Sequence, residues 1–279
     1  MLERISAGVS LARSSWRTLM SDKKLLLFPC ISGILTLLVI ASFFVPLGFL
    51  FKQGHLFDVD GKLRVWVYPI AFSAYFGAWF VIIFCNAALM SCVLLRFDGQ
   101  PASLGDGFRA AMLRRRQILG WAVVSACIGL LMMIIESHKR GGQLIARILG
   151  TAWSVMTFFT VPILVVQNVG PFAAIRGSVS LIRRTWGEAL VGKIGLGIVS
   201  LVLFLPVGGL FLAGYLMLAH DHRIAYALFA AGGLSLLAFA AVTSALRTVF
   251  MTALYQYAAF QRTPDGFDTE TLARAFHHK

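Results

Sequence analysis

Long apolar stretches alternate with short polar segments along this chain. A helix needs about 20 residues to cross a hydrocarbon core of about 30 Å. Six stretches approach or exceed that length, so we predict six transmembrane helices, at residues 25–51, 65–95, 117–135, 148–169, 194–219 and 224–260. The second and sixth exceed the membrane thickness and are expected to tilt or project beyond it. Pro162 and Pro206 are expected to kink the fourth and fifth helices.

A shorter pattern precedes two of these stretches. Residues 5–16 read ISAGVSLARSSW and residues 175–186 read IRGSVSLIRRTW. At helical spacing, the first copy places its apolar residues on one stripe and its arginines off it, which predicts an amphipathic helix with a basic face. Such a helix, followed by apolar stretches, is expected to lie among lipid headgroups and lead into a transmembrane hairpin. A weaker amphipathic segment surrounds Phe108, and there Gln117 takes the place of the tryptophan.

These segments predict an all-α polytopic membrane protein with a single transmembrane bundle over residues 1–262. The bundle is expected to consist of three units, each an amphipathic helix followed by a hairpin, at residues 1–95, 96–170 and 171–262. Residues 263–279 form the predicted cytoplasmic tail.

Composition supports a membrane protein. Charged residues make up 13% of the chain and hydrophobic residues 58%, whereas soluble domains carry about 25% charged residues. The net charge of +13 does not indicate nucleic acid as a partner, because the basic residues lie in short segments between apolar stretches. The four cysteines lie within apolar stretches without a CxxC pair, so neither a disulfide framework nor a zinc site is expected.

The distribution of basic residues predicts the orientation. With the amino terminus inside, 18 of the 25 lysines and arginines lie in segments on the inner side and 7 on the outer side. The positive-inside rule therefore predicts that both termini are cytoplasmic. All three amphipathic segments then meet the inner leaflet, where anionic headgroups attract basic side chains. The candidates for headgroup contact are Arg13, Arg17, Arg114, Arg115, Arg116, Arg183, Arg184 and Arg247.

The predicted spans contain little that could carry chemistry. None has an Asp, Glu or His at its centre, although ionisable groups at depth are typical of ion-coupled carriers and intramembrane catalysts. The deepest polar candidates are Asn86, Gln167 and Asn168. They either line a substrate path or form hydrogen bonds between helices.

Every histidine outside the carboxyl-terminal tail is predicted to lie on the outer side, with several acidic residues. Metal ligation needs converging side chains, and these loops show no established ligand spacing. We therefore expect no metal and no cofactor, and interpret the segment 220–223 as a solvated turn. A metal-dependent enzyme at the outer face would require convergence of His55, His138, His220 and His222.

The pattern VSLxRxxW before Lys23-Lys24-Leu25-Leu26-Leu27-Phe28-Pro29 resembles a family of uncharacterised bacterial and archaeal six-span membrane proteins. More loosely, the chain is similar to the membrane domain that precedes the catalytic domain of some glycerophosphodiester phosphodiesterases. The resemblance implies a prokaryotic inner-membrane protein and no assigned activity, and no hydrolytic residue carries over.

The leading hypothesis is a non-enzymatic membrane protein whose basic interfacial helices engage lipid headgroups or organise membrane partners, including other copies of itself. The alternative is a transporter or channel for a lipid or small solute, with kinks at Pro162 and Pro206 and the amides Gln167 and Asn168 on its path.

Overall fold

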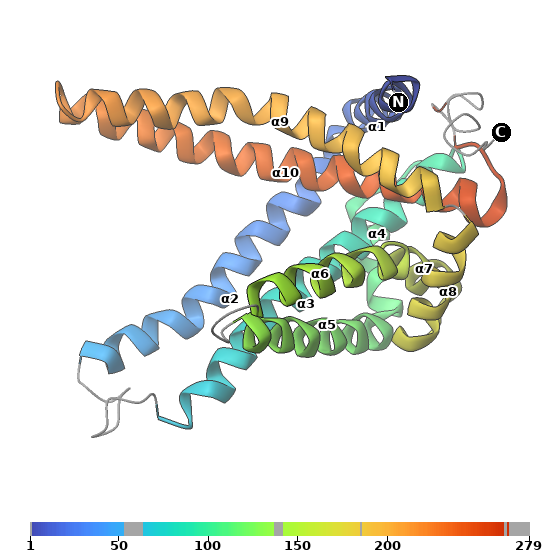
Figure 1. Cartoon of the computed structure of the whole chain (residues 1–279), viewed down its shortest axis with the longest axis horizontal. Coiled ribbons are helices and arrows are strands. Elements are labelled where there is room, and N and C mark those ends of the chain that lie inside the picture. The colour runs from blue at the N-terminus through green and yellow to red at the C-terminus, as the bar shows by residue number, and fades with distance from the viewer. Residues whose placement is uncertain (1, 53–63, 137–141, 185, 265–266, 268–279) are drawn as a thin grey trace. The chain divides into compact units, whose positions relative to one another are not determined.

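The computed structural model describes residues 2–52, 64–136, 142–184, 186–264 and 267. All regular elements within these ranges are helices, which confirms the predicted all-α class for the described part of the chain (Figure 1). They are α1 (Leu2–Ser21), the 3-10 helix η1 (Lys23–Leu26), α2 (Leu27–Lys52), α3 (Val67–Phe97), α4 (Leu104–Leu113), α5 (Arg115–Glu136), α6 (Gly142–Met156), α7 (Thr160–Gln167), α8 (Pro171–Arg184), α9 (Trp186–Met217) and α10 (His222–Phe260).

Six helical segments of the described chain are long and apolar enough to cross a membrane, which confirms the predicted number and order by length and composition. They are Lys23–Lys52, Val67–Phe97, Arg115–Glu136, Gly142–Gln167, Ser200–Met217 and His222–Phe260. The most apolar window of the first segment has none of its residues buried, and Phe44 in α2 is 63% exposed. Apolar side chains exposed over such a length are stable in lipid and unfavourable in water. We therefore treat the chain as a membrane protein.

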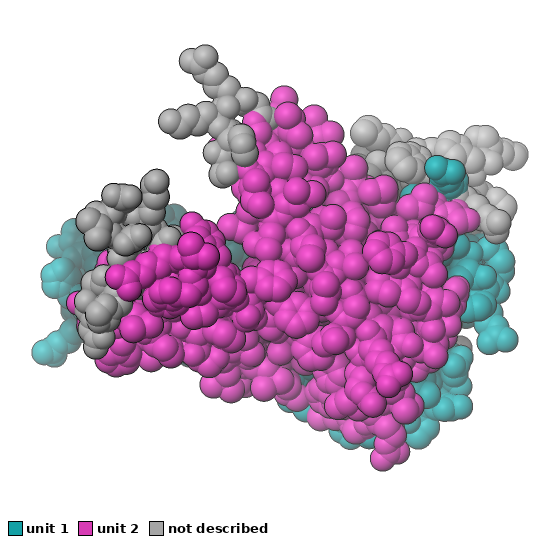
Figure 2. All heavy atoms as spheres, turned by 90° about the horizontal axis from the view of Figure 1, so that it is seen from below, with its two compact units in different colours: residues 1–29, 92–103, 181–279 teal, residues 30–91, 104–180 magenta. Residues whose placement is uncertain are grey.

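The chain divides into two compact units, each discontinuous in sequence (Figure 2). The first contains residues 1–29, 92–103 and 181–279, and the second contains residues 30–91 and 104–180. Each compact unit draws on all three predicted repeat units, so the threefold repeat stays a prediction.

In the first unit, α9 and α10 form an antiparallel pair joined by a short turn, and Figure 1 shows them side by side. Glycines bring the two helices close together. A Cβ atom on Gly214 would lie 3.2 Å from the ring of Phe229, and one on Gly232 would lie 3.2 Å from the ring of Phe211. Helix α1 contacts both α9 and α10. At 39 residues, α10 is about 58 Å long and exceeds a hydrocarbon core of about 30 Å, as expected for the sixth span.

In the second unit, aromatic rings follow one side of α3 at intervals of four residues. Adjacent rings lie with centroids 5.8–6.5 Å apart, and the last of them in α3, Phe84, stacks on Phe108 of α4. A second aromatic pair joins α5 to α6, where the rings of Trp121 and Trp153 stack at 5.9 Å. Dispersion between rings and between close-packed helices therefore stabilises this unit, as is typical of packing inside membranes.

The fourth span differs from the continuous helix predicted over 148–169. Its helix begins earlier, at Gly142, and is interrupted at residues 157–159, between α6 and α7. Pro162 explains the position of the break, because its nitrogen carries no hydrogen to bond the carbonyl oxygen of Phe158. The N–H of Phe159 instead donates to the buried hydroxyl of Ser178 in α8, at 3.0 Å. Sequence reasoning located the kink but not the partner that stabilises it.

Both copies of the repeated sequence lie on helices. Trp16 lies within α1, and residues 175–184 of the second copy lie in α8. Residue 185 is outside the described residues, and Trp186 is the first described residue of α9.

Candidate basic site on α1 and α3

Helix α1 exposes its arginines over the part whose side chains are described. Arg13 and Arg17, one helical turn apart, are both exposed, whereas Ser15 and Leu19 are fully buried. This agrees with a basic face opposite a packed face. The predicted apolar side chains at positions 2, 5, 9 and 12 lie outside the described side chains, and Trp16 is half-buried.

The end of α3 faces this helix within the same compact unit. Gly99 has a φ of 72°, its N–H bonds to the carbonyl oxygen of Arg96, and the N–H of Gln100 bonds to that of Leu95. These two bonds form a Schellman motif, in which a left-handed glycine ends the helix. The motif turns the chain sharply after α3. The residues that follow the helix therefore lie beside Arg96 in its last turn.

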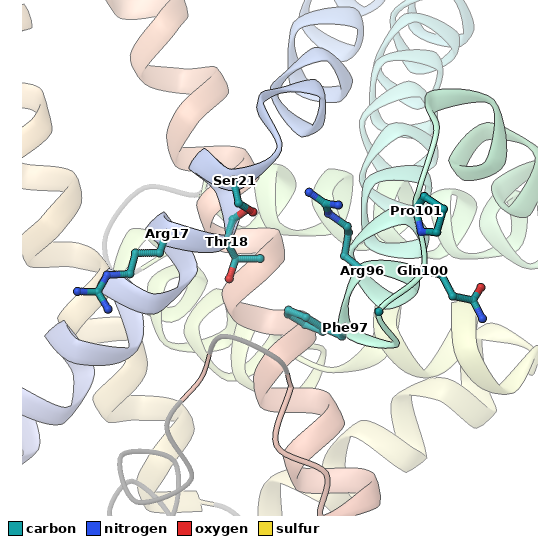
Figure 3. A pocket seen from close by; sticks show the side chains of 8 residues that line it. Arg17, Thr18, Ser21, Arg96, Phe97, Gln100 and Pro101 are labelled. Carbon is teal, nitrogen blue, oxygen red and sulfur yellow. The ribbon is translucent and has the colours of Figure 1, made fainter.

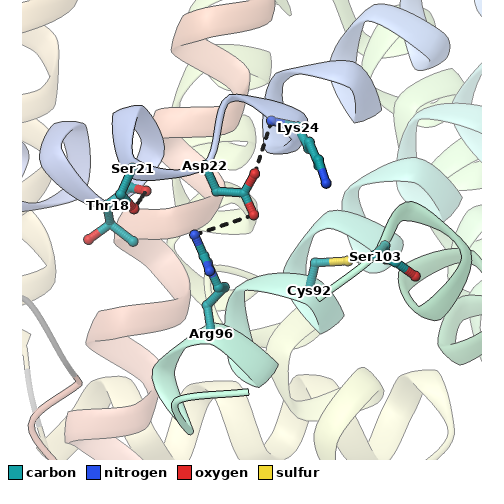
Figure 4. Close-up of polar contacts among 7 residues, drawn as sticks. All are labelled: Thr18, Ser21, Asp22, Lys24, Cys92, Arg96 and Ser103. Carbon is teal, nitrogen blue, oxygen red and sulfur yellow. Dashed lines mark hydrogen bonds and ion pairs between the residues drawn. The ribbon is translucent and has the colours of Figure 1, made fainter. Parts of the chain in front are cut away.

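An ion pair links the end of α3 to the end of α1. Arg96 Nη2 lies 3.4 Å from Asp22 Oδ2, and the side chains are 33% and 13% exposed (Figure 4). Asp22 also caps η1, since its Oδ1 accepts the backbone N–H of Lys24 at 3.2 Å. One carboxylate therefore starts the 3-10 helix and orients the guanidinium of Arg96.

A cavity of about 680 Å³ lies between these elements (Figure 3). Its described lining residues come from α1 and from the end of α3, and none of these is acidic: Arg17, Thr18, Ser21, Arg96, Phe97, Gly99, Gln100 and Pro101. Figure 3 shows Arg96 rising from α3 toward Thr18 and Ser21, while Arg17 extends outward from α1. The hydroxyls of Thr18 and Ser21 donate to the carbonyl oxygens of Ser14 and Thr18, respectively. Their oxygen lone pairs are left to accept hydrogen bonds from a ligand.

Sequence reasoning selected Arg17 and missed Arg96. Arg96 is the first charged residue after the charge-free stretch 65–95, and it precedes an Asp-Gly pair. A cation at the end of a long apolar helix, next to a turn signal, is the sequence feature that marks it.

The remaining basic candidates lie elsewhere. Arg114, at the junction of α4 and α5, is half-buried, and its Nε has no hydrogen-bond partner among the described residues. Arg115 donates weakly to the carbonyl oxygen of Met112 at 3.4 Å, and Arg116 is exposed. Arg183 on α8 and Arg247 on α10 are also exposed, and the side chain of Arg184 is not among the described side chains.

The amide candidates for a polar path differ in their exposure. Asn86 is half-buried within α3, whereas Gln167 is exposed at the last residue of α7. Asn168 has a φ of 54° at the C-cap of that helix. Asparagine tolerates this left-handed conformation better than most residues, so helix termination explains Asn168 without a transport role.

The turn at residues 220–223, which is predicted to lie on the outer side, is explained by helix capping. Asp221 caps α10, with its Oδ1 accepting the N–H groups of Arg223 and Ile224 at 2.7 and 3.4 Å. The ring of His222 stacks on Tyr226. Within the described ranges, no three His, Cys, Asp or Glu residues gather as metal ligands would. His55 and His138, which the outer-face enzyme hypothesis requires, lie outside the described residues.

Comparison with known proteins identifies a family and no activity. Residues 65–266, well over half of the chain, match a family described as "Family of unknown function (DUF6159)". Searches of curated proteins and of solved structures found no match. The looser likeness to glycerophosphodiester phosphodiesterases stays a prediction.

Proposed function

Because this chain belongs to the family of unknown function DUF6159, we propose a role from its own residues. It is a non-enzymatic prokaryotic inner-membrane protein that engages anionic lipid headgroups. Basic helices beside the apolar spans make these contacts. A protein held against lipid in this way is suited to organising other membrane proteins or further copies of itself at the inner leaflet.

The observation that carries the proposal is the exposure of arginines on helices that lead into apolar spans. Arg13 and Arg17 on α1 and Arg183 on α8 are exposed, and none of them pairs with an acidic side chain of the described chain. An unpaired cation near an anionic leaflet contributes about 1 kcal/mol of binding free energy. Several such residues on helices that lead into apolar spans favour lipid contact over a purely structural role.

The predicted topology supports the same proposal. The positive-inside rule assigns the segments that hold 18 of the 25 basic residues to the cytoplasmic side. Anionic lipids give that leaflet its negative surface potential. The arginines and the lipids are therefore expected to meet on one side of the membrane.

Native mass spectrometry of the full chain in a mild non-ionic detergent tests the proposal. We expect the wild type to retain an anionic lipid such as phosphatidylglycerol in preference to phosphatidylcholine. The double substitution Arg183→Gln and Arg184→Gln should weaken retention, because each removes a cation from the predicted inner side. Arg223→Gln, on the predicted outer turn, is the matched control and should retain lipid as the wild type does. Equal retention of anionic and zwitterionic lipid by the wild type would overturn the proposal.

A second candidate function is transport of a lipid or small solute, and the break between α6 and α7 is the observation that bears on it. Interrupted helices commonly form the binding sites of secondary transporters. The break is surrounded by buried apolar side chains, including Phe158, Phe159 and Ile163, which favours a packed helix junction over a polar path. Solute uptake into vesicles containing the purified chain, abolished by substituting Gln167 and Asn168, would favour transport instead.

A further inference from the structure

The cavity between α1 and the end of α3 combines the features of a specific anion site. Arg17 on α1 and Arg96 on α3 line it from two elements far apart in the sequence, and no described lining residue is acidic. Its volume of about 680 Å³ falls within the range of about 300–1,000 Å³ that is typical of small-ligand sites. The cavity is open to its surroundings, so a charged ligand can enter it.

We propose that this cavity binds a phosphate ester that carries hydroxyl groups, the chemistry of a glycerol phosphate headgroup. The inference rests on the proposed function and deepens it, because it assigns headgroup recognition to one site. The same chemistry is offered by two sources, an anionic lipid such as phosphatidylglycerol and a soluble glycerol phosphate.

Arg96 is the main phosphate ligand. Asp22 contacts one nitrogen, Nη2, of its guanidinium, and a guanidinium presents five N–H donors in a planar fork. The donors that do not face Asp22 remain for a phosphate, which arginine binds through two parallel hydrogen bonds. Asp22 acts as a positioning residue, since it holds the side chain in the direction that Figure 4 shows.

Arg17 supplies a second charge at the edge of the cavity. Its side chain is exposed and extends outward from α1 (Figure 3), so it can rotate toward a bound anion. Because an exposed cation gains less from such a contact than a partly enclosed one, Arg17 is expected to contribute less affinity than Arg96.

The hydroxyls of Thr18 and Ser21 select for a ligand that donates hydrogen bonds. Their protons are engaged by backbone carbonyl oxygens, so toward the cavity they act as acceptors. A glycerol headgroup supplies hydroxyl donors, whereas choline supplies none. Phe97, 7% exposed, and Pro101 add apolar lining for the carbon atoms of the ligand.

The test measures lipid retention by native mass spectrometry and thermal stabilisation by added glycerol 3-phosphate, both on the full chain in mild detergent. We expect Arg96→Gln to weaken phosphatidylglycerol binding about tenfold and Arg17→Gln about fivefold, as expected for the loss of charge-assisted hydrogen bonds. Arg13→Gln, one turn from Arg17 and outside the cavity lining, removes only a general headgroup contact and should weaken binding less than Arg96→Gln does. Arg223→Gln, on the predicted outer turn, is the matched control and should change binding less than about twofold.

Two further variants separate ligand binding from folding. Asp22→Asn removes the ion pair but keeps the charge of Arg96, so it should weaken binding less than Arg96→Gln does. Equal losses in these two variants would mean that the ion pair acts only on structure, and would overturn the assignment of Arg96 as a ligand. Arg96→Lys keeps the charge without the fork and replaces Arg96→Gln if that variant does not fold. If Arg96→Lys binds phosphatidylglycerol with wild-type affinity, the two parallel hydrogen bonds of a guanidinium are not needed, and that mode of recognition is overturned.

The remaining outcomes distinguish this inference from the proposed function. If Arg13→Gln weakens binding as much as Arg17→Gln and Arg96→Gln, or if only the double α8 variant does, the cavity is overturned and the general headgroup role stands. Absence of any anionic preference in the wild type, together with no stabilisation by glycerol 3-phosphate, overturns both. Stabilisation by glycerol 3-phosphate that Arg96→Gln abolishes, without retained lipid, supports the cavity with a soluble ligand.

Discussion

At the residue level, the break in the fourth span depends on a single hydroxyl. The buried N–H of Phe159 has lost its helical acceptor and donates to Ser178 Oγ at 3.0 Å. Ser178→Ala should lower the free energy of unfolding by about 1–3 kcal/mol, because it removes the hydrogen bond that Ser178 accepts from this buried donor. Ser180→Ala, an exposed position on the same helix, is the control and should have little effect. Denaturation in detergent measures both, and equal stabilities would contradict this role for Ser178.

The conformation of Gly99 permits the turn that ends α3. A Cβ atom built there meets nothing within 4 Å, so the cost of a side chain is conformational and arises from the φ of 72°. Gly99→Ala should destabilise the protein by about 1–2 kcal/mol, as measured by thermal unfolding. Gly99→Asn should cost less, since asparagine adopts left-handed conformations more readily. If alanine and asparagine have the same cost, the backbone conformation is not the cause.

At the level of elements, the close packing of α9 against α10 depends on a glycine at the position of α10 that faces α9. Gly232 lies against the ring of Phe211, whereas a Cβ on the adjacent Gly233 would meet nothing within 4 Å. Gly232→Leu should therefore separate the helices and cost about 1–3 kcal/mol through overpacking. Gly233→Leu is its control and should be tolerated, because its side chain points away from the contact. Equal unfolding temperatures for the two variants would show that the pair is not closely packed in the membrane.

Helix ends were predictable only where the residue itself marks them. The Gly-Pro pair at 170–171 is a sequence signal for a helix break, and α8 begins at Pro171, where proline is favoured at the first helical position. The end of α10 carries no such signal, since Gln261 adopts a φ of 54° without being glycine or asparagine. The helix of the fifth span was predicted from residue 194 but already includes Trp186, because residues before the apolar stretch extend the helix without a sequence marker.

At the level of the whole molecule, the orientation in the membrane is the central prediction. In a background without the four native cysteines, a cysteine at Ala110 should react with a membrane-impermeant maleimide only after the cells are opened. A cysteine at His220 should react in intact cells, because the positive-inside rule places the short turn outside. Labelling of Ala110→Cys in intact cells would reverse the predicted topology and remove the arginines of α1 from the inner leaflet.

The sequence by itself determined the class of the protein, the six apolar helices and the segments that carry basic charge. These properties are local: a helix satisfies its own backbone hydrogen bonds, and hydropathy is summed along a continuous stretch. Only the tertiary structure placed the ion pair of Arg96 and Asp22 near Arg17. It also placed the hydroxyl of Ser178 within hydrogen-bond distance of the N–H of Phe159. Such contacts join residues far apart in the chain, and they depend on which helices pack together, which hydropathy does not encode.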